Sequence, residues 1–235
     1  MAKEPSDLET FPKLLLAHAQ ARGGLPAIRE KDRGIWRTLT WHELADESLA
    51  LAAALAARGI GRGSHVALVG DNRPRLYTAI CAVHALGAIA VPLYQDASAE
   101  EMTALLQRAE ASHVFAENQE QVDKLLEVLP RCPSIRCVIY DDDRGMRHYR
   151  QPELTRYTEL LRQGRELNRS DALRAEALRG NAQDPAFRFV KVVLADTEDV
   201  WGAYFQQRGQ TYSRPKLTVF RGRIATACGS GESAM

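Results

Sequence analysis

Short apolar runs alternate with amphipathic stretches from about residue 25 to residue 140, and glycine or proline often separates them. Two extended runs, Ala27 to Arg29 and Trp36 to Thr38, flank the charged turn Lys31–Gly34 and predict a β-hairpin. Four further strands are predicted within residues 65–69, 88–91, 112–116 and 136–140. Because a helix-length segment separates each of these strands from the next, the pattern predicts an α/β fold with a parallel sheet covered by helices.

The ends of the helices between these strands are marked by particular residues. Thr40 with Glu43, and Ser98 with Glu101, have the spacing of a capping box, in which a hydroxyl and a carboxylate satisfy free backbone N–H groups at a helix start. Gly87 predicts the end of a helix that begins near Pro74. These signals predict the same strand–helix alternation as the apolar runs.

The pattern weakens after residue 140. A loop is predicted over 141–145, a modest helix over 152–162, and residues 164–185 are polar without an apolar strand. Further on, an apolar stripe over 189–205 predicts a helix, and residues 217–220 and 223–225 predict a second hairpin joined through Gly222. We therefore divide the chain into a first region over 1–165, a joint over 166–183 and a last segment over 184–235.

Composition and charge exclude several classes of protein. The 235 residues are 45% hydrophobic and 26% charged, which is typical of a globular chain. A formal net charge of +1 gives no general attraction to nucleic acid or an anionic membrane. The apolar window 77–93 contains His84, Gly87 and Pro92, so no membrane span is expected. The four scattered cysteines and a start without the apolar stretch of a signal peptide favour a cytoplasmic location.

Motifs for catalysis and for metal binding are incomplete. His42-Glu43-Leu-Ala-Asp46 approaches a zinc-peptidase helix but has aspartate at the second ligand position, and the capping role already explains Glu43. No serine lies in a Gly-x-Ser-x-Gly elbow, and the glycines of Gly59–Gly63 open no helix with a following lysine. The sequence therefore predicts no catalytic, cofactor-binding or metal-ligating residue.

Asp71 and Asn72 are the candidate ligand-binding residues. They follow the predicted strand 65–69 at its carboxyl end, where open α/β sheets bind ligands. Turn formation explains the two residues equally well. His84 is predicted to pack in a core or an interface rather than to act in catalysis.

Four segments carry a family resemblance, namely Leu39–Leu44, Val66–Pro74, Ala85–Asp96 and Glu117–Lys124. They resemble the N-terminal part of AMP-forming acyl-CoA synthetases, particularly bacterial long-chain fatty acid CoA ligases, over about residues 8–165. The resemblance implies the N-terminal subdomain of the adenylate-forming ligase fold. For a complete ligase it also implies ATP, Mg and coenzyme A as cofactors, fatty acid and coenzyme A as partners, and acyl-CoA formation through an acyl-adenylate. The family's phosphate loop, Tyr-Gly-x-Thr-Glu motif, ribose-binding aspartate and C-terminal lysine have no counterpart in these 235 residues.

A second resemblance covers about residues 184–235. Phe189–Trp201, Tyr212–Phe220 and Thr226–Met235 resemble the region before the active site of neutral zinc metallopeptidases. That family uses zinc held by a His-Glu-x-x-His helix, which this sequence lacks, and Cys228 would pair with a cysteine that is also absent.

The leading interpretation is a ligase fragment joined to a metallopeptidase segment, either as a fused chain or through a mis-joined reading frame. The 235 residues are expected to bind no cofactor and to be inactive in both reactions. A zinc peptidase fragment and a non-catalytic interaction module are the alternatives, and whether the chain is an enzyme stays open.

Overall fold

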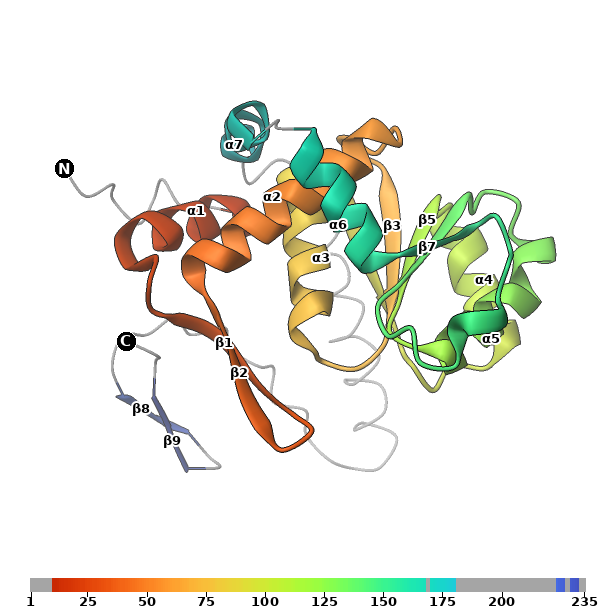
Figure 1. The fold of residues 1–235 in the computed structure, drawn as a ribbon, viewed down its shortest axis with the longest axis horizontal. Coiled ribbons are helices and arrows are strands. Elements are labelled where there is room, and N and C mark those ends of the chain that lie inside the picture. The colour runs from red at the N-terminus through yellow and green to blue at the C-terminus, as the bar shows by residue number, and fades with distance from the viewer. Residues whose placement is uncertain (1–9, 168–169, 181–222, 227–228, 233–235) are drawn as a thin grey trace, which may run out of the picture. The chain divides into compact units, whose positions relative to one another are not determined.

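Figure 1 shows the fold in a computed structural model, which describes residues 10–167, 170–180, 223–226 and 229–232. The chain divides into two compact units, Met1–Val190 and Lys191–Met235. The predicted helical stripe over 189–205 and the predicted strand 217–220 lie outside the described residues.

A five-stranded parallel sheet is the centre of the first unit. Its strand order is β4-β3-β5-β6-β7, and every neighbouring pair is parallel. The strands are β3 (His65–Val69), β4 (Ile89–Leu93), β5 (His113–Ala116), β6 (Cys137–Tyr140) and β7 (Leu154–Arg156). The α/β fold class predicted from the sequence is confirmed.

Helices cover both faces of this sheet and form a separate core on each (Figure 1). In β3, Val66 and Leu68 belong to one core and Ala67 and Val69 to the other, because successive side chains of a strand point to opposite faces. The first core contains side chains of α2 (Trp41–Ala57), α3 (Pro74–Ala85), α6 (Tyr157–Glu166) and α7 (Ser170–Arg179). The second core contains side chains of α4 (Ala99–Ala109) and α5 (Gln119–Val128).

The predicted capping boxes are present at the starts of α2 and α4. Thr40 Oγ1 accepts a hydrogen bond from the backbone N–H of Glu43 at 3.2 Å, and the Glu43 carboxylate accepts one from the Thr40 N–H at 2.8 Å. Ser98 and Glu101 make the same reciprocal pair at 3.3 and 2.9 Å. Gly87, at φ +65°, follows the end of α3, as predicted.

The predicted hairpin consists of β1 (Pro26–Asp32) and β2 (Ile35–Thr40), which form their own antiparallel sheet. Its two turn residues, Arg33 and Gly34, have φ of +48° and +83°. Positive φ at both central residues defines a type I′ turn, whose twist matches that of the two strands. Helix α1 (Phe11–Arg22) precedes the hairpin.

Three features of the first unit differ from the sequence prediction. Residues 154–156 form strand β7, so the helix predicted over 152–162 begins only at Tyr157. A three-residue edge strand is too short to show a period of two, which explains the error. Helices α1 and α7 were not predicted. The polar stretch 164–185 contains α7, whose Leu173 and Ala177 are buried in the first core.

The second unit contains β8 (Arg223–Thr226) and β9 (Gly229–Glu232), which pair antiparallel. The strand predicted over 223–225 is confirmed, but its described partner is β9, which was not predicted.

The described part of the first unit also contains two short η helices, η2 (Leu129–Arg131) and η3 (Met146–His148). No helix among the described residues is both long and apolar enough to cross a membrane.

Candidate functional site

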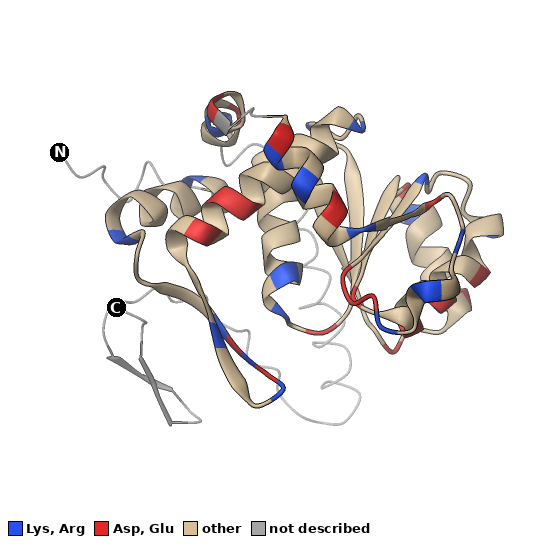
Figure 2. Ribbon diagram, viewed as in Figure 1, with Lys and Arg blue, Asp and Glu red and all other residues tan. Residues whose placement is uncertain are grey.

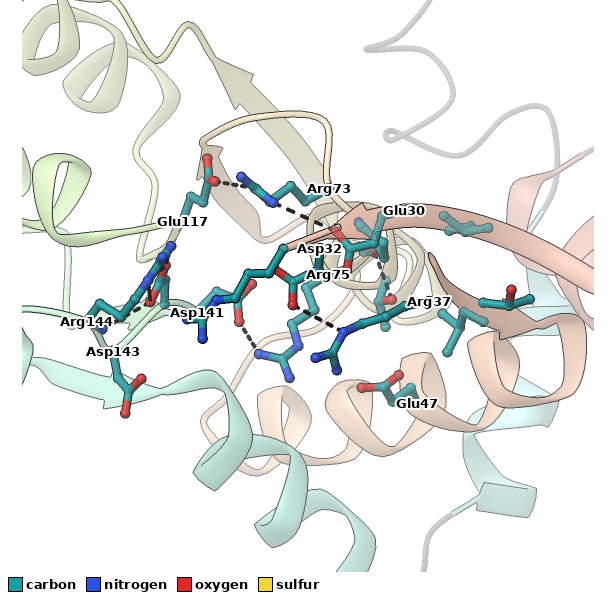
Figure 3. Close-up of a pocket in the computed structure, with 17 residues that line it drawn as sticks. Glu30, Asp32, Arg37, Glu47, Arg73, Arg75, Glu117, Asp141, Asp143 and Arg144 are labelled. Carbon is teal, nitrogen blue, oxygen red and sulfur yellow. Dashed lines mark hydrogen bonds and ion pairs between the residues drawn. The ribbon is translucent and has the colours of Figure 1, made fainter. Parts of the chain in front are cut away.

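A charged cleft of about 400 Å³ lies between the β1–β2 hairpin and the carboxyl edge of the parallel sheet (Figure 3). The loops that follow β3, β5 and β6 supply one side of its lining, and the hairpin supplies the other. Its charged residues are seven carboxylates and five arginines: Glu30, Asp32, Glu47, Glu117, Asp141, Asp142, Asp143, Arg33, Arg37, Arg73, Arg75 and Arg144. The carboxyl edge is the part of an open α/β sheet where ligands bind.

Ion pairs across the cleft connect the hairpin with the sheet. Arg73 Nε donates to Glu117 Oε1 at 2.6 Å, and Arg73 also lies 3.8 Å from a Glu30 oxygen on β1 (Figure 3). Within the hairpin, Arg37 Nε lies 3.1 Å from Asp32. Arg73 thus lies between a carboxylate of the hairpin and one that follows β5.

Arg75 lines the cleft beside α2 and the loop after β6. Its guanidinium pairs with Asp141, which follows β6, and stacks over the Tyr157 ring with 5.1 Å between Arg75 Cζ and the ring centroid. Burial raises the pKa of Asp141, although Arg75 acts against this. Burial likewise raises the pKa of Glu47 on α2, again opposed by Arg75. Arg75 therefore opposes the rise in pKa of two carboxylates, of which Asp141 is its ion-pair partner.

The structure places Asp71 and Asn72 in the exposed turn after β3, as the sequence predicts. The Asp71 backbone N–H donates to Glu117 Oε2 at 2.6 Å, and the Asp71 carbonyl accepts from the Arg73 N–H at 2.7 Å. Asp71 lines a small cavity of about 20 Å³ together with Arg73, Arg75 and other residues, and Asn72 is not among those lining residues. These two hydrogen bonds account for Asp71 as a turn residue. The ligand-binding role of Asp71 and Asn72 stays a prediction.

The sequence reasoning missed Glu117, Asp141 and Arg75 as members of this cleft. A signal was present, because Glu117 and Asp141 directly follow the predicted strands 112–116 and 136–140. Charged residues at the carboxyl ends of neighbouring parallel strands meet at one edge of the sheet. Arg75 gave no such signal, since it lies inside a helix.

The cleft does not fit a nucleoside triphosphate as its residues stand. Its lining has more carboxylates than arginines, and Arg37, Arg73, Arg75 and Arg144 are each already paired with a carboxylate. A polyphosphate needs unpaired cations and backbone N–H groups of a glycine-rich loop at a helix start. We therefore derive no step through ATP from this cleft.

The histidines do not form a metal site in the part of the chain that the structure describes. His42 Nε2 lies 3.2 Å from Asp46, while Glu43 serves as a cap. No group of three or more His, Cys, Asp or Glu side chains with metal-binding geometry occurs among the described residues. His84 is partly buried, its ring stacks on that of Phe11 with 6.0 Å between centroids, and burial lowers its pKa to about 4.

The parallel sheet with helices on both faces defines an open α/β protein. The chain belongs to the AMP-binding enzyme family, whose model matches residues 15–187, more than half of the chain. A second family model, described as "Putative neutral zinc metallopeptidase", matches residues 153–235. The two matches overlap over the end of the first unit.

Among curated proteins, the chain is 31% identical over 106 residues to the long-chain-fatty-acid–CoA ligase FadD15 of Mycobacterium bovis. The matched residues cover 45% of this chain and 18% of FadD15. It is 49% identical over 53 residues to the uncharacterized protein YpfJ of Escherichia coli K12, covering 23% of this chain and 18% of YpfJ. The chain thus spans about a fifth of the length of these relatives.

Among solved structures, the adenylation domain of a carboxylate reductase from Mycobacterium chelonae is similar with a TM-score of 0.58 and 22% identity. The similarity covers 70% of this chain and 30% of that structure. It establishes the fold of the first unit as that of the N-terminal part of an adenylation domain. The family match and the similarity to FadD15 show that the chain is related to adenylate-forming CoA ligases.

Proposed function

We propose that this chain is a fragment of an ATP-dependent long-chain fatty acid CoA ligase and that its 235 residues do not form acyl-adenylate or acyl-CoA by themselves. The observation that carries the proposal is the charge of the cleft at the carboxyl edge. Four of its five arginines are paired with carboxylates, and the carboxylates outnumber the arginines, so the cleft has too little free positive charge to neutralise a triphosphate. The family's phosphate loop and later motifs are also absent from the printed sequence.

The complete ligase would join a fatty acid carboxylate to the α-phosphorus of ATP with release of pyrophosphate, and the thiol of coenzyme A would then displace AMP. Within such a protein the first unit would act as one wall of the catalytic domain. In this proposal Asp71 and Asn72 would face the ligand from the loop after β3. Magnesium, ATP and coenzyme A belong to the complete ligase, and this fragment would bind none of them.

The test is fatty-acid-dependent exchange of pyrophosphate into ATP. We expect the purified chain to give no exchange above a reaction without fatty acid, while a complete long-chain fatty acid CoA ligase, assayed beside it, gives exchange. An Arg75→Met variant is the matched control, because a trace of contaminating host ligase would be unaffected by it. Exchange that requires fatty acid and falls in Arg75→Met would overturn the proposed inactivity.

The match over residues 153–235 supports a second candidate, a fragment of a neutral zinc metallopeptidase. Since the sequence has no His-Glu-x-x-His motif, we expect the purified chain to retain no stoichiometric zinc after dialysis and to leave peptide substrates uncut. Metal analysis together with a peptide-cleavage assay measures both. One zinc per chain with cleavage would favour the peptidase over the ligase.

The joint between the two resemblances is proposed within residues 166–183, and the location is proposed to be cytoplasmic. Re-reading the nucleotide sequence across codons 160 to 190 tests the fusion. One uninterrupted frame there argues for a genuine fused chain, and a frame change argues for a mis-joined one. The third candidate, a non-catalytic interaction module, would use the exposed face of an incomplete sheet.

A further inference from the structure

The two faces of the β1–β2 hairpin carry different charges. Alternation along the strands puts Glu30, Asp32 and Arg37 on the face that lines the cleft, where the acids are held by ion pairs. Lys31 and its cross-strand partner Trp36 point to the opposite face, and Arg29 lies on that same side, two residues before Lys31. The outer face therefore presents two cations and a tryptophan without an acidic side chain at these positions.

The tip of the hairpin also exposes apolar side chains. Ile35 and Trp36 are 65% and 66% exposed, which places them among the most exposed large apolar residues described. Isolated exposed apolar residues are ordinary, but here two adjacent ones follow a tight turn that projects from the helices (Figure 1). Figure 2 shows basic residues along the hairpin and at its turn, with acidic residues between them.

The direction of the two apolar side chains decides what kind of partner fits. Ile35 and Trp36 are neighbours in a strand, so they point to opposite faces of the hairpin. A flat protein surface would cover only one of them, and two side chains are far less than the area of about 800 Å² that a stable protein interface buries on each partner. A fluid interface can surround both when the hairpin enters tip first.

We propose that the tip of the β1–β2 hairpin, Lys31–Arg37, docks on the surface of an anionic lipid bilayer, with Ile35 and Trp36 in the headgroup region and Arg29, Lys31 and Arg33 against lipid phosphates. Tryptophan favours the interface because its ring is apolar and its N–H is polar. Each basic residue near an anionic bilayer increases partitioning by about fivefold. Docking tip first also brings Glu30 and Asp32 near the bilayer, but residues 29–37 contain four basic and two acidic side chains and keep a formal net charge of +2, against +1 for the whole chain.

The experiment is flotation of the full chain with vesicles in a density gradient, which separates bound protein from aggregates because aggregates do not float. One set of vesicles contains phosphatidylglycerol and phosphatidylcholine, and the other contains phosphatidylcholine alone. We expect flotation with the anionic vesicles at millimolar lipid, weaker flotation with the neutral ones, and release by high salt. Equal flotation with both lipids, or none with either, would overturn the proposal.

Variants separate the tip from the rest of the surface. We expect the double variant Ile35→Asn and Trp36→Ala to weaken binding by about tenfold or more, and Arg29→Gln with Lys31→Gln to weaken it by a similar factor. Tyr94→Ala, at a residue that is 86% exposed outside the hairpin, and Arg131→Gln are the matched apolar and basic controls. Unchanged binding in the tip variants, or an equal loss in the controls, would contradict the proposal. If a tip variant fails to fold, flotation of the unaltered chain with anionic and neutral vesicles, at low and high salt, still tests whether the chain binds an anionic bilayer.

Discussion

Gly164 decides how closely α6 approaches α2. A Cβ built at this position would overlap with the backbone carbonyl of Ala50, and the two helices are in extensive contact along this line. Because the obstacle is backbone and not a movable side-chain end, the helices would have to separate to admit even one methyl group. The glycine is inside a helix, so close packing offsets its unfavourable helix propensity.

We expect Gly164→Ala to lower the free energy of unfolding by about 3 kcal/mol, since overpacking outweighs the gain in helix propensity. Urea unfolding followed by circular dichroism measures the change. Gly61→Ala is the matched control, because a Cβ there meets nothing within 4 Å. Similar unfolding midpoints for the two variants would show that α6 does not pack on α2 as described.

Burial of histidines predicts a stability that depends on pH. Burial lowers the pKa of His84 to about 4 and is also the main cause that lowers the pKa of His113 to about 4, against an ordinary value near 6.5. Between these values the unfolded chain binds protons that the folded chain excludes, so the free energy of unfolding falls as pH drops from about 6.5 to about 4. We expect His84→Gln to make this decline shallower, measured by urea unfolding at a series of pH values.

The exposed His148→Gln serves as the control for His84→Gln and is expected to leave the decline unchanged. A decline that is equally steep in both variants would mean that folding does not lower the pKa of His84, so that the folded and unfolded chains protonate it at the same pH. The stacking of His84 on Phe11 would then hold a charged ring.

At the scale of elements, local signals predicted most helix starts and strands, and the errors have a physical cause. The capping boxes at Thr40 and Ser98 fixed the starts of α2 and α4, because capping depends on residues three apart in sequence. The strand β7 and the helix α7 depend instead on distant partners. Among the strands that the structure describes, β7 pairs only with β6, and α7 is held by two buried side chains and by ion pairs to α2 and the loop after it.

The cap of α4 supplies the prediction at this scale. Ser98→Ala removes the acceptor for the Glu101 N–H and is expected to lower the free energy of unfolding by about 1 kcal/mol at neutral pH. Hydrogen bonds from Ser98 lower the pKa of Glu101, so this stabilisation is present above the ordinary glutamate pKa and is lost as pH falls through the lowered one. Urea unfolding at neutral and acidic pH measures the free energy of unfolding of both chains, and we expect the difference between them to become smaller at acidic pH.

Ser134→Ala, in an exposed turn, is the control for the cap and should be nearly neutral at both pH values. If Ser98→Ala and Ser134→Ala have the same effect, the capping box contributes nothing to the folded chain.

At the scale of the whole molecule, the candidate site was predicted only in part. The sequence located the carboxyl edge of the sheet and named Asp71 and Asn72 there, because strand ends can be read from apolar runs. The partners Glu117, Arg75 and Asp141 come from separate loops and a helix, and only the strand order brings them to one cleft. The hairpin supplies the other wall, and it contacts the rest of the unit through an apolar cluster with α1 and α2 and an ion pair to Arg73, which no local pattern encodes.

The extent of the first unit is open to a direct test, because the proposed joint 166–183 contains α7. Leu173 and Ala177 are buried in the core beside α2 and α3, and Arg62 lies 2.7 Å from Glu176. A chain ending at Val190 keeps these contacts and is expected to unfold at the same urea concentration as the full chain. A chain ending at Arg165 loses them, and we expect its free energy of unfolding to be lower by about 2–4 kcal/mol, since it uncovers apolar surface of α2 and α3. Equal stability of the two shortened chains would show that α7 belongs to the joint and not to the folded unit.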